Sequence, residues 1–443
     1  MTMRRAKKMN NTHIEEIKSA IFGEKYDLIH HRSGLDIYLF PKKTATTYAL
    51  FATNYGSVDN CFKIAGEDDY TTVPEGIAHF LEHKMFACED GSDAFDRFSQ
   101  FGADANAYTS YDKTVYLFSC TSDFVPCLAE LMDFVTHPFF TDESVKKEQG
   151  IIGEEIGMYD DSPSNRSYYA MLGALYHSHD IKNNVCGTLK SIENITPEML
   201  YRCHKVFYNY SNMVLVICGD VTAEEVISVA DGHLPECEKT EIIRKGHIEP
   251  PHAVCERVEN RMQLAVPIFD IGIKDASVPC SAAERARRDV IMSVIADLLF
   301  SKTGKLYSAL YDEGLISPAV SSGYTISKDF GYTTFSGESD DPDAVYKRVK
   351  DYIAKMKHEG FEREDFERCR KVFYASFVRE LDSADDIANN LVSFVFDGYD
   401  FFGYADIIAG VTYEEVMEAL RGSYLPECFT MSAVFPIENA KKG

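Results

Sequence analysis

The sequence predicts an α+β protein built from two related domains, each an antiparallel-rich sheet packed with helices, joined by a linker. The 443 residues fit two domains of roughly 220 residues each. Hydrophobic residues make up 45% of the chain and aromatic residues 12%, which is enough for two large cores. A charged segment with a Pro-Pro pair interrupts the apolar pattern near the middle. The predicted parts are an N-terminal domain over residues 1–235, a linker over 236–258 and a C-terminal domain over 259–443.

The order of the predicted elements recurs in both halves. Short apolar runs at 48–53, 115–120 and 213–218 are typical of strands. Thr196 and Thr412 each precede a nearby Glu and a helical pattern, and both helices are followed by another apolar run. This recurrence indicates an internal duplication, which supports the division into two similar domains.

The composition excludes several classes of protein. The chain has 45 Lys and Arg against 70 Asp and Glu, a net charge of -25, which argues against nucleic acid or anionic lipid as the main partner. Apolar runs stay below the ~18–20 residues of a membrane span. The basic residues 1–8 lead into a polar stretch rather than an apolar core, and the 12 cysteines form no C-x-x-C pair. We therefore expect a cytoplasmic protein with no nucleic-acid or membrane partner.

The most specific local pattern is H-x-x-E-H, formed by His79, Glu82 and His83. Thr72 and Glu75 predict a capping box that opens a helix here, and all three motif residues then project from one helix face. Two imidazoles one turn apart suit a tetrahedral Zn²⁺, and an adjacent carboxylate can take a proton from water. The alternative is an amphipathic helix whose histidines are only solvated.

A zinc site of this kind needs a third protein ligand, and residues 147–158 offer one. On a helix, Glu148 and Glu155 lie at the edge of an apolar face, whereas Glu154 points toward solvent. This geometry favours Glu155 as the ligand, with Glu148 behind it as a carboxylate that orients the other ligands. The alternative is that both are ordinary surface charges beside a core stripe. The apolar face comprises Val145, Ile152, Ile156 and Tyr159.

Together, these residues resemble the inverzincin zinc peptidases of the pitrilysin, insulin-degrading and mitochondrial processing peptidase type. His79-x-x-Glu82-His83 is followed some seventy residues later by Glu148 and Glu155, as in that family. Residues 187–188, 195–197 and 211–221 match its later landmarks in order. The resemblance spans nearly the whole chain and implies the duplicated α+β domain of the family.

The resemblance also implies a mechanism. Zn²⁺ would be held by His79, His83 and Glu155, which makes zinc the expected cofactor. Glu82 would act as general base toward the attacking water and later pass the proton to the leaving amine.

Residues 102–110 resemble the segment that leads into the substrate-pairing edge strand of the family. Its members that would contact a peptide added as an extra strand are Asn106, Ala107 and Tyr108. The alternative interpretation of this stretch is a Gly-Ala turn leading into a core strand.

The second half departs from a complete site. Aligning Phe86 with Phe300 and Phe140 with Phe361 predicts no metal site there. The residues that then stand opposite the histidines and carboxylates are Ser293, Ala296, Asp297 and Ser376.

In many relatives the second half contributes an Arg and a Tyr that polarise the scissile carbonyl. Here Tyr311 stands at the Arg position and Ser317 near the Tyr position. Either Tyr324 or another group of this chain substitutes, or a related chain supplies the pair, as in two-subunit members. The Lys84-Met85-Phe86 sequence resembles the bacterial two-subunit members, which favours a partner: a related subunit in a heterodimer, or a second copy in a homodimer.

The sequence therefore predicts a zinc endopeptidase that hydrolyses peptides or unfolded segments. The competing hypothesis is a non-catalytic docking or assembly subunit of a related peptidase complex that retains zinc for structure. The missing Arg-Tyr pair is the feature that favours this second hypothesis.

Overall fold

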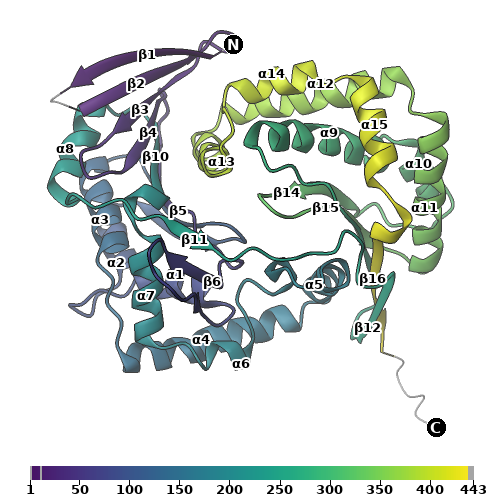
Figure 1. Ribbon diagram of the computed structural model, residues 1–443, viewed down its shortest axis with the longest axis horizontal. Helices are drawn as coiled ribbons and strands as arrows, with labels where there is room; N and C mark the ends of the chain where they lie inside the picture. The colour runs from purple at the N-terminus through teal and green to yellow at the C-terminus, as the bar shows by residue number, and fades with distance from the viewer. Residues whose placement is uncertain (1, 10–11, 438–443) are drawn as a thin grey trace.

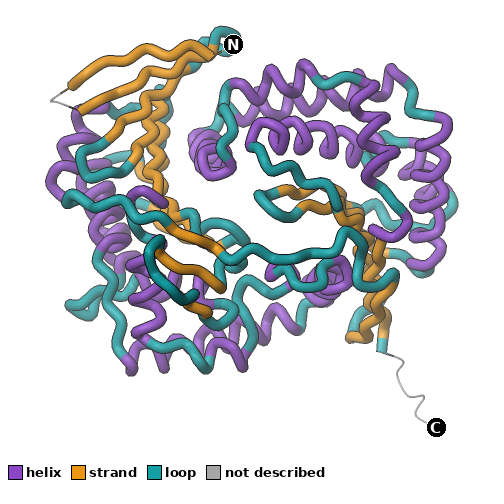
Figure 2. The backbone as a smooth tube through the Cα atoms, in the orientation of Figure 1, coloured by secondary structure: helices purple, strands orange, loops and turns teal. Residues whose placement is uncertain are grey.

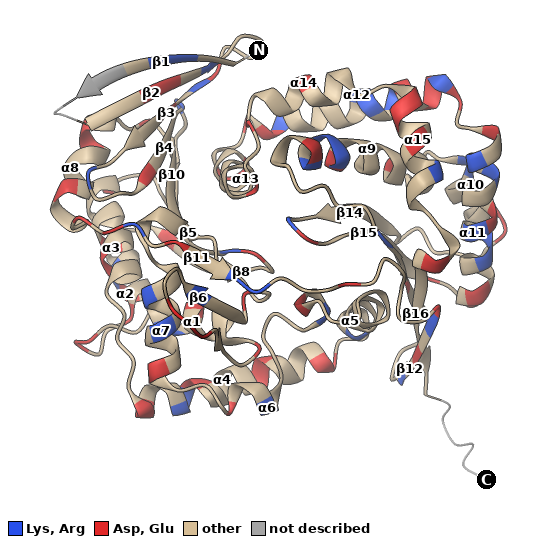
Figure 3. Cartoon of the chain, in the orientation of Figure 1, with Lys and Arg blue, Asp and Glu red and all other residues tan. Residues whose placement is uncertain are grey.

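The computed structural model describes residues 2–9 and 12–437 and confirms a mixed fold with one large sheet in each half of the chain. The two halves face each other, and each carries helices on its sheet (Figures 1 and 2). In Figure 3, Asp and Glu are spread over the elements of both halves rather than gathered at one of them. Within the described residues, no helix combines the length and apolar character needed to cross a membrane.

The N-terminal half is built on an eight-stranded sheet in the order β1-β2-β3-β4-β10-β5-β9-β8. All neighbours are antiparallel except β4 and β10, which run parallel. β8 forms one edge of this sheet and pairs with β9 alone. The strands are β1 (Thr2–Met9), β2 (Thr12–Ser19), β3 (Lys25–His30), β4 (Asp36–Pro41), β5 (Thr47–Thr53), β8 (Asp104–Thr109), β9 (Thr114–Cys120) and β10 (Met213–Gly219).

Helices cover one face of this sheet and bury a core in which Phe51, Phe80, Phe118 and Leu128 are fully enclosed. These helices are α1 (Ile77–Met85), α2 (Ala94–Gln100), α3 (Phe124–Thr136), α4 (Asp142–Asp160), α6 (Leu189–Ile192), α7 (Pro197–Phe207) and α8 (Ala223–His233). A small second sheet consists of β6 (Cys61–Ile64), β7 (Thr71–Thr72) and β11 (Ile242–Arg244). β11 lies inside the segment expected to be a linker, so part of that segment is regular structure paired with β6.

The C-terminal half repeats the plan with a five-stranded sheet in the order β12-β16-β13-β15-β14, in which β12 and β16 form the parallel pair. The strands are β12 (Arg257–Met262), β13 (Ile268–Lys274), β14 (Ser321–Ile326), β15 (Gly331–Glu338) and β16 (Phe429–Pro436). The helices are α9 (Ala282–Phe300), α10 (Lys305–Asp312), α11 (Pro342–Glu359), α12 (Arg363–Glu380), α14 (Gly403–Gly410) and α15 (Tyr413–Ser423).

Each half also lends one helix to the sheet of the other half (Figure 1). α5 (Pro163–Leu175) packs on β12, β13 and β16, where Gly272 leaves room for Met171 and Leu175. α13 (Ala384–Asp397) packs on β5 and β10 through Leu391 and Val392. The exchange buries apolar side chains of both halves in shared cores, which fixes the halves relative to each other.

A single carboxylate, that of Glu249, ties the connecting segment to both halves. It accepts hydrogen bonds from the backbone N–H groups of His177, Ser178 and His179 at 2.7, 2.9 and 3.0 Å. It also accepts one from the buried Lys274 ammonium at 2.6 Å. Burial opposes its ionisation, but these bonds prevail and lower the pKa of Glu249 to about 2.

We expect Glu249→Gln to lower the free energy of unfolding by about 3–5 kcal/mol at neutral pH, because the buried Lys274 loses its counter-charge. The folded-state pKa lies below the ordinary value of 4.5, so this stabilisation is present above about pH 4.5 and is lost as the pH falls toward about 2. Urea unfolding followed by circular dichroism should therefore show a large difference between wild type and variant at neutral pH, narrowing in acid. Equal stability at neutral pH would contradict the role assigned to this carboxylate.

Candidate active site

The helix that carries the H-x-x-E-H motif begins at Ile77, later than the sequence predicts. Thr72 lies in β7, and Glu75 accepts a hydrogen bond from the Asn183 amide at 2.9 Å, so the expected capping box is wrong. Gly76 precedes the helix with a φ of 86°, and a Cβ there would lie 2.4 Å from the Cys186 carbonyl oxygen. This left-handed residue, held against a distant segment, prevents the helix from starting earlier.

α1 and α4 bring three potential metal ligands together. His79 Nε2 lies 3.7 Å from Glu155 Oε1, and His83 Nε2 lies 3.6 Å from Glu155 Oε2. The three ligand atoms all lie within 4.8 Å of one another. Zinc ligands about 2.0–2.1 Å from the ion lie about 3.4 Å apart in a tetrahedron. The observed separations are too long for hydrogen bonds and close to this spacing, so the donor set fits a divalent ion. Glu154, one residue earlier on α4, is exposed.

The two imidazoles differ in how readily they give up a proton to a metal. Burial, with a smaller effect of the neighbouring His83, lowers the pKa of His79 to about 3 and keeps its ring neutral. His83 Nδ1 lies 3.2 Å from Glu148 Oε1. An ionised carboxylate only accepts, so Nδ1 carries a proton and Nε2 is the ligand atom that faces Glu155. Burial acts to lower the pKa of His83, but the bond with Glu148 and the charge of Glu82 raise it overall, so a metal that binds Nε2 competes with a proton there. Burial opposes the ionisation of Glu148, but its bond with His83 and the charge of Lys84 lower its pKa.

Glu82 lines a cavity together with His79, His83 and Glu155 but is not one of the three potential ligands. Its Oε2 accepts a hydrogen bond from Thr109 Oγ1 at 2.7 Å. Burial raises the pKa of Glu82, while the bond with Thr109 and the proximity of His83 oppose that rise. Sequence reasoning gave Thr109 no role. Strand alternation could have found it, because Ala105, Ala107 and Thr109 share one face of β8 and only Thr109 has a hydroxyl there.

The site opens into a cavity of about 850 Å³ whose described lining belongs entirely to the N-terminal half and includes no arginine. α1, α4 and the edge strand β8 form its walls. Cys186 also borders it, with Sγ 3.8 Å from His79 Nε2. Burial raises the pKa of the Cys186 thiol to about 12, so at neutral pH it is protonated and is a poor fourth ligand.

The three predicted peptide-contacting residues lie in β8, at the free edge of the sheet and along the cavity. Asn106 Oδ1 accepts a hydrogen bond from the Ala107 backbone N–H at 2.9 Å. The Tyr108 hydroxyl donates to Asn389 Oδ1 of α13 at 2.9 Å. The Tyr108 side chain thus joins the two halves.

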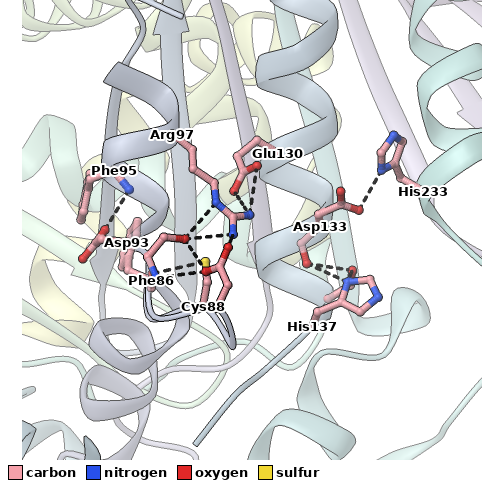
Figure 4. Close-up of polar contacts among 12 residues, drawn as sticks. Phe86, Cys88, Asp93, Phe95, Arg97, Glu130, Asp133, His137 and His233 are labelled. Atoms are coloured by element: carbon pink, nitrogen blue, oxygen red, sulfur yellow. Dashed lines mark hydrogen bonds and ion pairs between the residues drawn. The ribbon is translucent and has the colours of Figure 1, made fainter. Parts of the chain in front are cut away.

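The segment after α1 supplies an apolar wall of the cavity and is held by an arginine (Figure 4). The rings of Phe86 and Phe95 stack with their centroids 4.1 Å apart. The Arg97 guanidinium donates to Asp90 at 2.9 Å and to Glu130 of α3 at 3.2 Å. These bonds tie the loop and α2 to α3, so the aromatic pair has a fixed position beside the motif.

The second-half residues considered for the Arg-Tyr pair do not line the cavity described above. Tyr311 is 48% exposed and stacks on Tyr307. The backbone N–H of Ser317 donates to the Glu338 carbonyl. The Tyr324 side chain is half-buried and its hydroxyl donates to Asp275 at 2.6 Å, so it is already engaged.

The positions aligned with the zinc motif also hold no metal set. Among the described residues, no group of three clustered potential ligands occurs in the C-terminal half. Ala296 of α9 is buried in the core, and the Ser293 hydroxyl faces Asp289 on the same helix.

Comparison with known proteins also distinguishes the first half of the chain, which carries the potential metal ligands, from the second half. The family model described as "Insulinase (Peptidase family M16)" matches residues 67–189, and "Peptidase M16 inactive domain" matches residues 194–373. The chain is 35% identical to the uncharacterized zinc protease YmfH of Bacillus subtilis (strain 168), over 95% of this chain and 98% of that protein. The chain belongs to peptidase family M16. The predicted resemblance is therefore confirmed.

Solved structures with the same fold include other M16 peptidases. An M16-like peptidase from Alicyclobacillus acidocaldarius has a TM-score of 0.88 and 32% identity, covering 98% of this chain and 99% of its own. A protease from Helicobacter pylori has a TM-score of 0.80 at 19% identity, covering 93% of this chain and 100% of its own. Pitrilysin has a TM-score of 0.72 at 16% identity, and the match covers 94% of this chain but 45% of pitrilysin. The last two likenesses concern the fold alone.

Proposed function

We propose that this M16 peptidase is a zinc-dependent endopeptidase that hydrolyses peptides or unfolded segments. The observation that carries the proposal is the convergence of His79, His83 and Glu155 beside the buried carboxylate of Glu82. The relatives named zinc proteases support the choice of Zn²⁺. The match to the inactive-domain model lies mostly in the second half, so it does not count against the ligands of the first half.

In this proposal, Zn²⁺ held by His79, His83 and Glu155 supplies the Lewis acidity that activates water and polarises the scissile carbonyl. The Glu82 carboxylate takes a proton from the attacking water and then gives it to the leaving amine. The Thr109 hydroxyl fixes one oxygen of Glu82 at 2.7 Å, so the other oxygen is left to accept that proton.

The substrate would add to the free edge of β8 as an antiparallel or parallel strand. The Ala107 N–H is bonded to the Asn106 side chain, so a peptide carbonyl must displace that amide to take the N–H. The stacked Phe86 and Phe95 rings then offer an apolar surface for a substrate side chain next to the cavity.

A partner subunit is part of the proposal. The described lining of the cavity includes no arginine, Tyr311 lies outside it, and Tyr324 is engaged by Asp275. A related M16 chain in a heterodimer, or a second copy in a homodimer, would supply an arginine to the developing oxyanion.

The location proposed for the protein is the cytoplasm. The 12 cysteines are free thiols, which supports a reducing compartment of this kind.

The test is cleavage of a mixed peptide pool by the purified, zinc-loaded chain, read by mass spectrometry. We expect products at internal bonds that vanish with 1,10-phenanthroline and return with added Zn²⁺. Cleavage by the chain alone would support the endopeptidase and exclude an obligatory related subunit. Cleavage only after a related M16 subunit is added would support the heterodimer. Zinc binding without cleavage in either case would overturn the catalytic proposal and favour the docking role.

A further inference from the structure

Outside the proposed active site, the N-terminal sheet carries another trio of potential metal ligands. His13 and Glu15 belong to β2, and His30 belongs to β3. His13 and His30 stand directly opposite each other in the antiparallel register, so their side chains leave the same face. Their rings are nearly parallel, with centroids 5.5 Å apart and an interplanar angle of 11°.

The donor atoms of this trio converge on one point. His13 Nε2 and His30 Nε2 each lie 3.6 Å from the same oxygen, Oε1 of Glu15. All three atoms lie within 4.8 Å of one another. The corresponding separations in the proposed catalytic trio are 3.7 and 3.6 Å, so the two trios have nearly the same spacing. Such distances exceed a hydrogen bond and suit ligands of a common ion.

A neighbouring carboxylate sets the state of one imidazole. Asp36 of β4 stands opposite His30, and its Oδ1 lies 2.7 Å from His30 Nδ1. An ionised carboxylate only accepts, so the proton is on Nδ1 and Nε2 presents its lone pair toward Glu15. A carboxylate that orients a histidine in this way is a common feature of metal sites in proteins. The Arg4 guanidinium lies 3.8 Å from the other Glu15 oxygen and leaves Oε1 to the imidazoles.

We propose that His13, Glu15 and His30 form a second metal site that binds Zn²⁺. Two imidazoles are borderline donors that favour zinc over the hard cations Mg²⁺ and Ca²⁺, and a carboxylate oxygen completes many zinc sites. The bound ion would cross-link β2 to β3, next to the sheet edge formed by β1 (Figure 1).

This site is separate from the proposed catalytic centre. In the sheet order, β3 and β8 are five strand spacings apart, which corresponds to roughly 24 Å. His13 and His30 also lie on the face that carries Ile17, Tyr26 and the aromatic side chains of the C-terminal half, whereas α1 covers the other face. The ligands of one site therefore take no part in the other, and the proposal does not rest on the proposed function.

Zinc stoichiometry of the full chain tests the proposal. The metal-free protein is dialysed against buffered Zn²⁺ near neutral pH, and bound zinc is measured by mass spectrometry of the metal. We expect two ions per wild-type chain, one per His13→Asn/His30→Asn chain and one per Glu155→Ala chain. The exposed His358 is the matched control, and His358→Asn should keep two. Asp36→Asn should keep the second ion with about 10–100-fold weaker affinity, because the proton of His30 is then no longer held on Nδ1 by a carboxylate.

The outcomes separate the two sites. One ion in wild type that disappears in Glu155→Ala would overturn the second site and leave the catalytic proposal standing. One ion that disappears in the His13→Asn/His30→Asn chain would support the second site and count against the catalytic one. Two ions that persist in the double variant would also overturn the second site. Hydrogen exchange of the backbone amides of residues 12–19 and 25–30 is an independent readout. Zn²⁺ should slow this exchange in the Glu155→Ala chain. It should have no effect in a chain that carries Glu155→Ala together with His13→Asn and His30→Asn.

Discussion

Glu82→Gln is expected to slow peptide cleavage by orders of magnitude while leaving the fold and the zinc content unchanged. The amide has nearly the shape of the carboxylate and can still accept the hydrogen bond from Thr109. It cannot take a proton from the attacking water at neutral pH, so the step that creates the nucleophile loses its base. General-base catalysis of this kind contributes about 10²–10⁴-fold, and we expect kcat to fall by that factor.

Three measurements on the same preparation make this result interpretable. Turnover of a peptide identified in the pool gives the loss of activity, metal analysis gives the zinc content, and thermal unfolding shows that the variant is folded. The matched control is Glu143→Gln, an exposed acid at the start of α4, which should retain wild-type turnover. A Glu82→Gln chain that turns over within a few-fold of wild type would mean that another group accepts the proton.

Local helical geometry was sufficient to predict the core of the site. The i, i+3 and i+4 spacing of His79, Glu82 and His83 puts them on one face of α1 whatever surrounds that helix. The choice between Glu154 and Glu155 follows from their phase on α4, because only one of them shares the side that faces α1. Such features are carried by a single element, so periodicity alone gives them.

Features that depend on contacts distant in the sequence escaped prediction. The start of α1 is set by Gly76 against Cys186, more than a hundred residues away. The exchange of α5 and α13 between halves depends on which sheet each apolar face meets. The register that places His13 opposite His30 is likewise a property of strand pairing rather than of either strand. Both strands bury one set of alternating side chains, and neither sequence alone shows its partner.

The largest contrast between adjacent residues is expected at Glu155 and Glu154. Glu155→Ala removes the carboxylate whose two oxygens face His79 and His83, so the proposed catalytic zinc would lose one of its three protein ligands. Loss of a residue that only orients a ligand weakens metal binding about 10–100-fold, and loss of the ligand itself should exceed that range. Cleavage should fall below detection at zinc concentrations that saturate wild type.

Glu154→Ala is the control that removes the same chemical group from the same turn of α4. Its side chain is exposed and lies about 100° around the helix, so zinc affinity and turnover should match wild type. Zinc titrations followed by peptide cleavage compare both variants directly, since activity reports only the catalytic ion and is insensitive to zinc bound at His13 and His30. Equal activity of the two variants would show that the ion is held by other groups, and the assignment of α4 as the source of the third ligand would have to be abandoned. Loss of activity in both would instead indicate that α4 had shifted as a whole, which circular dichroism and thermal unfolding would detect.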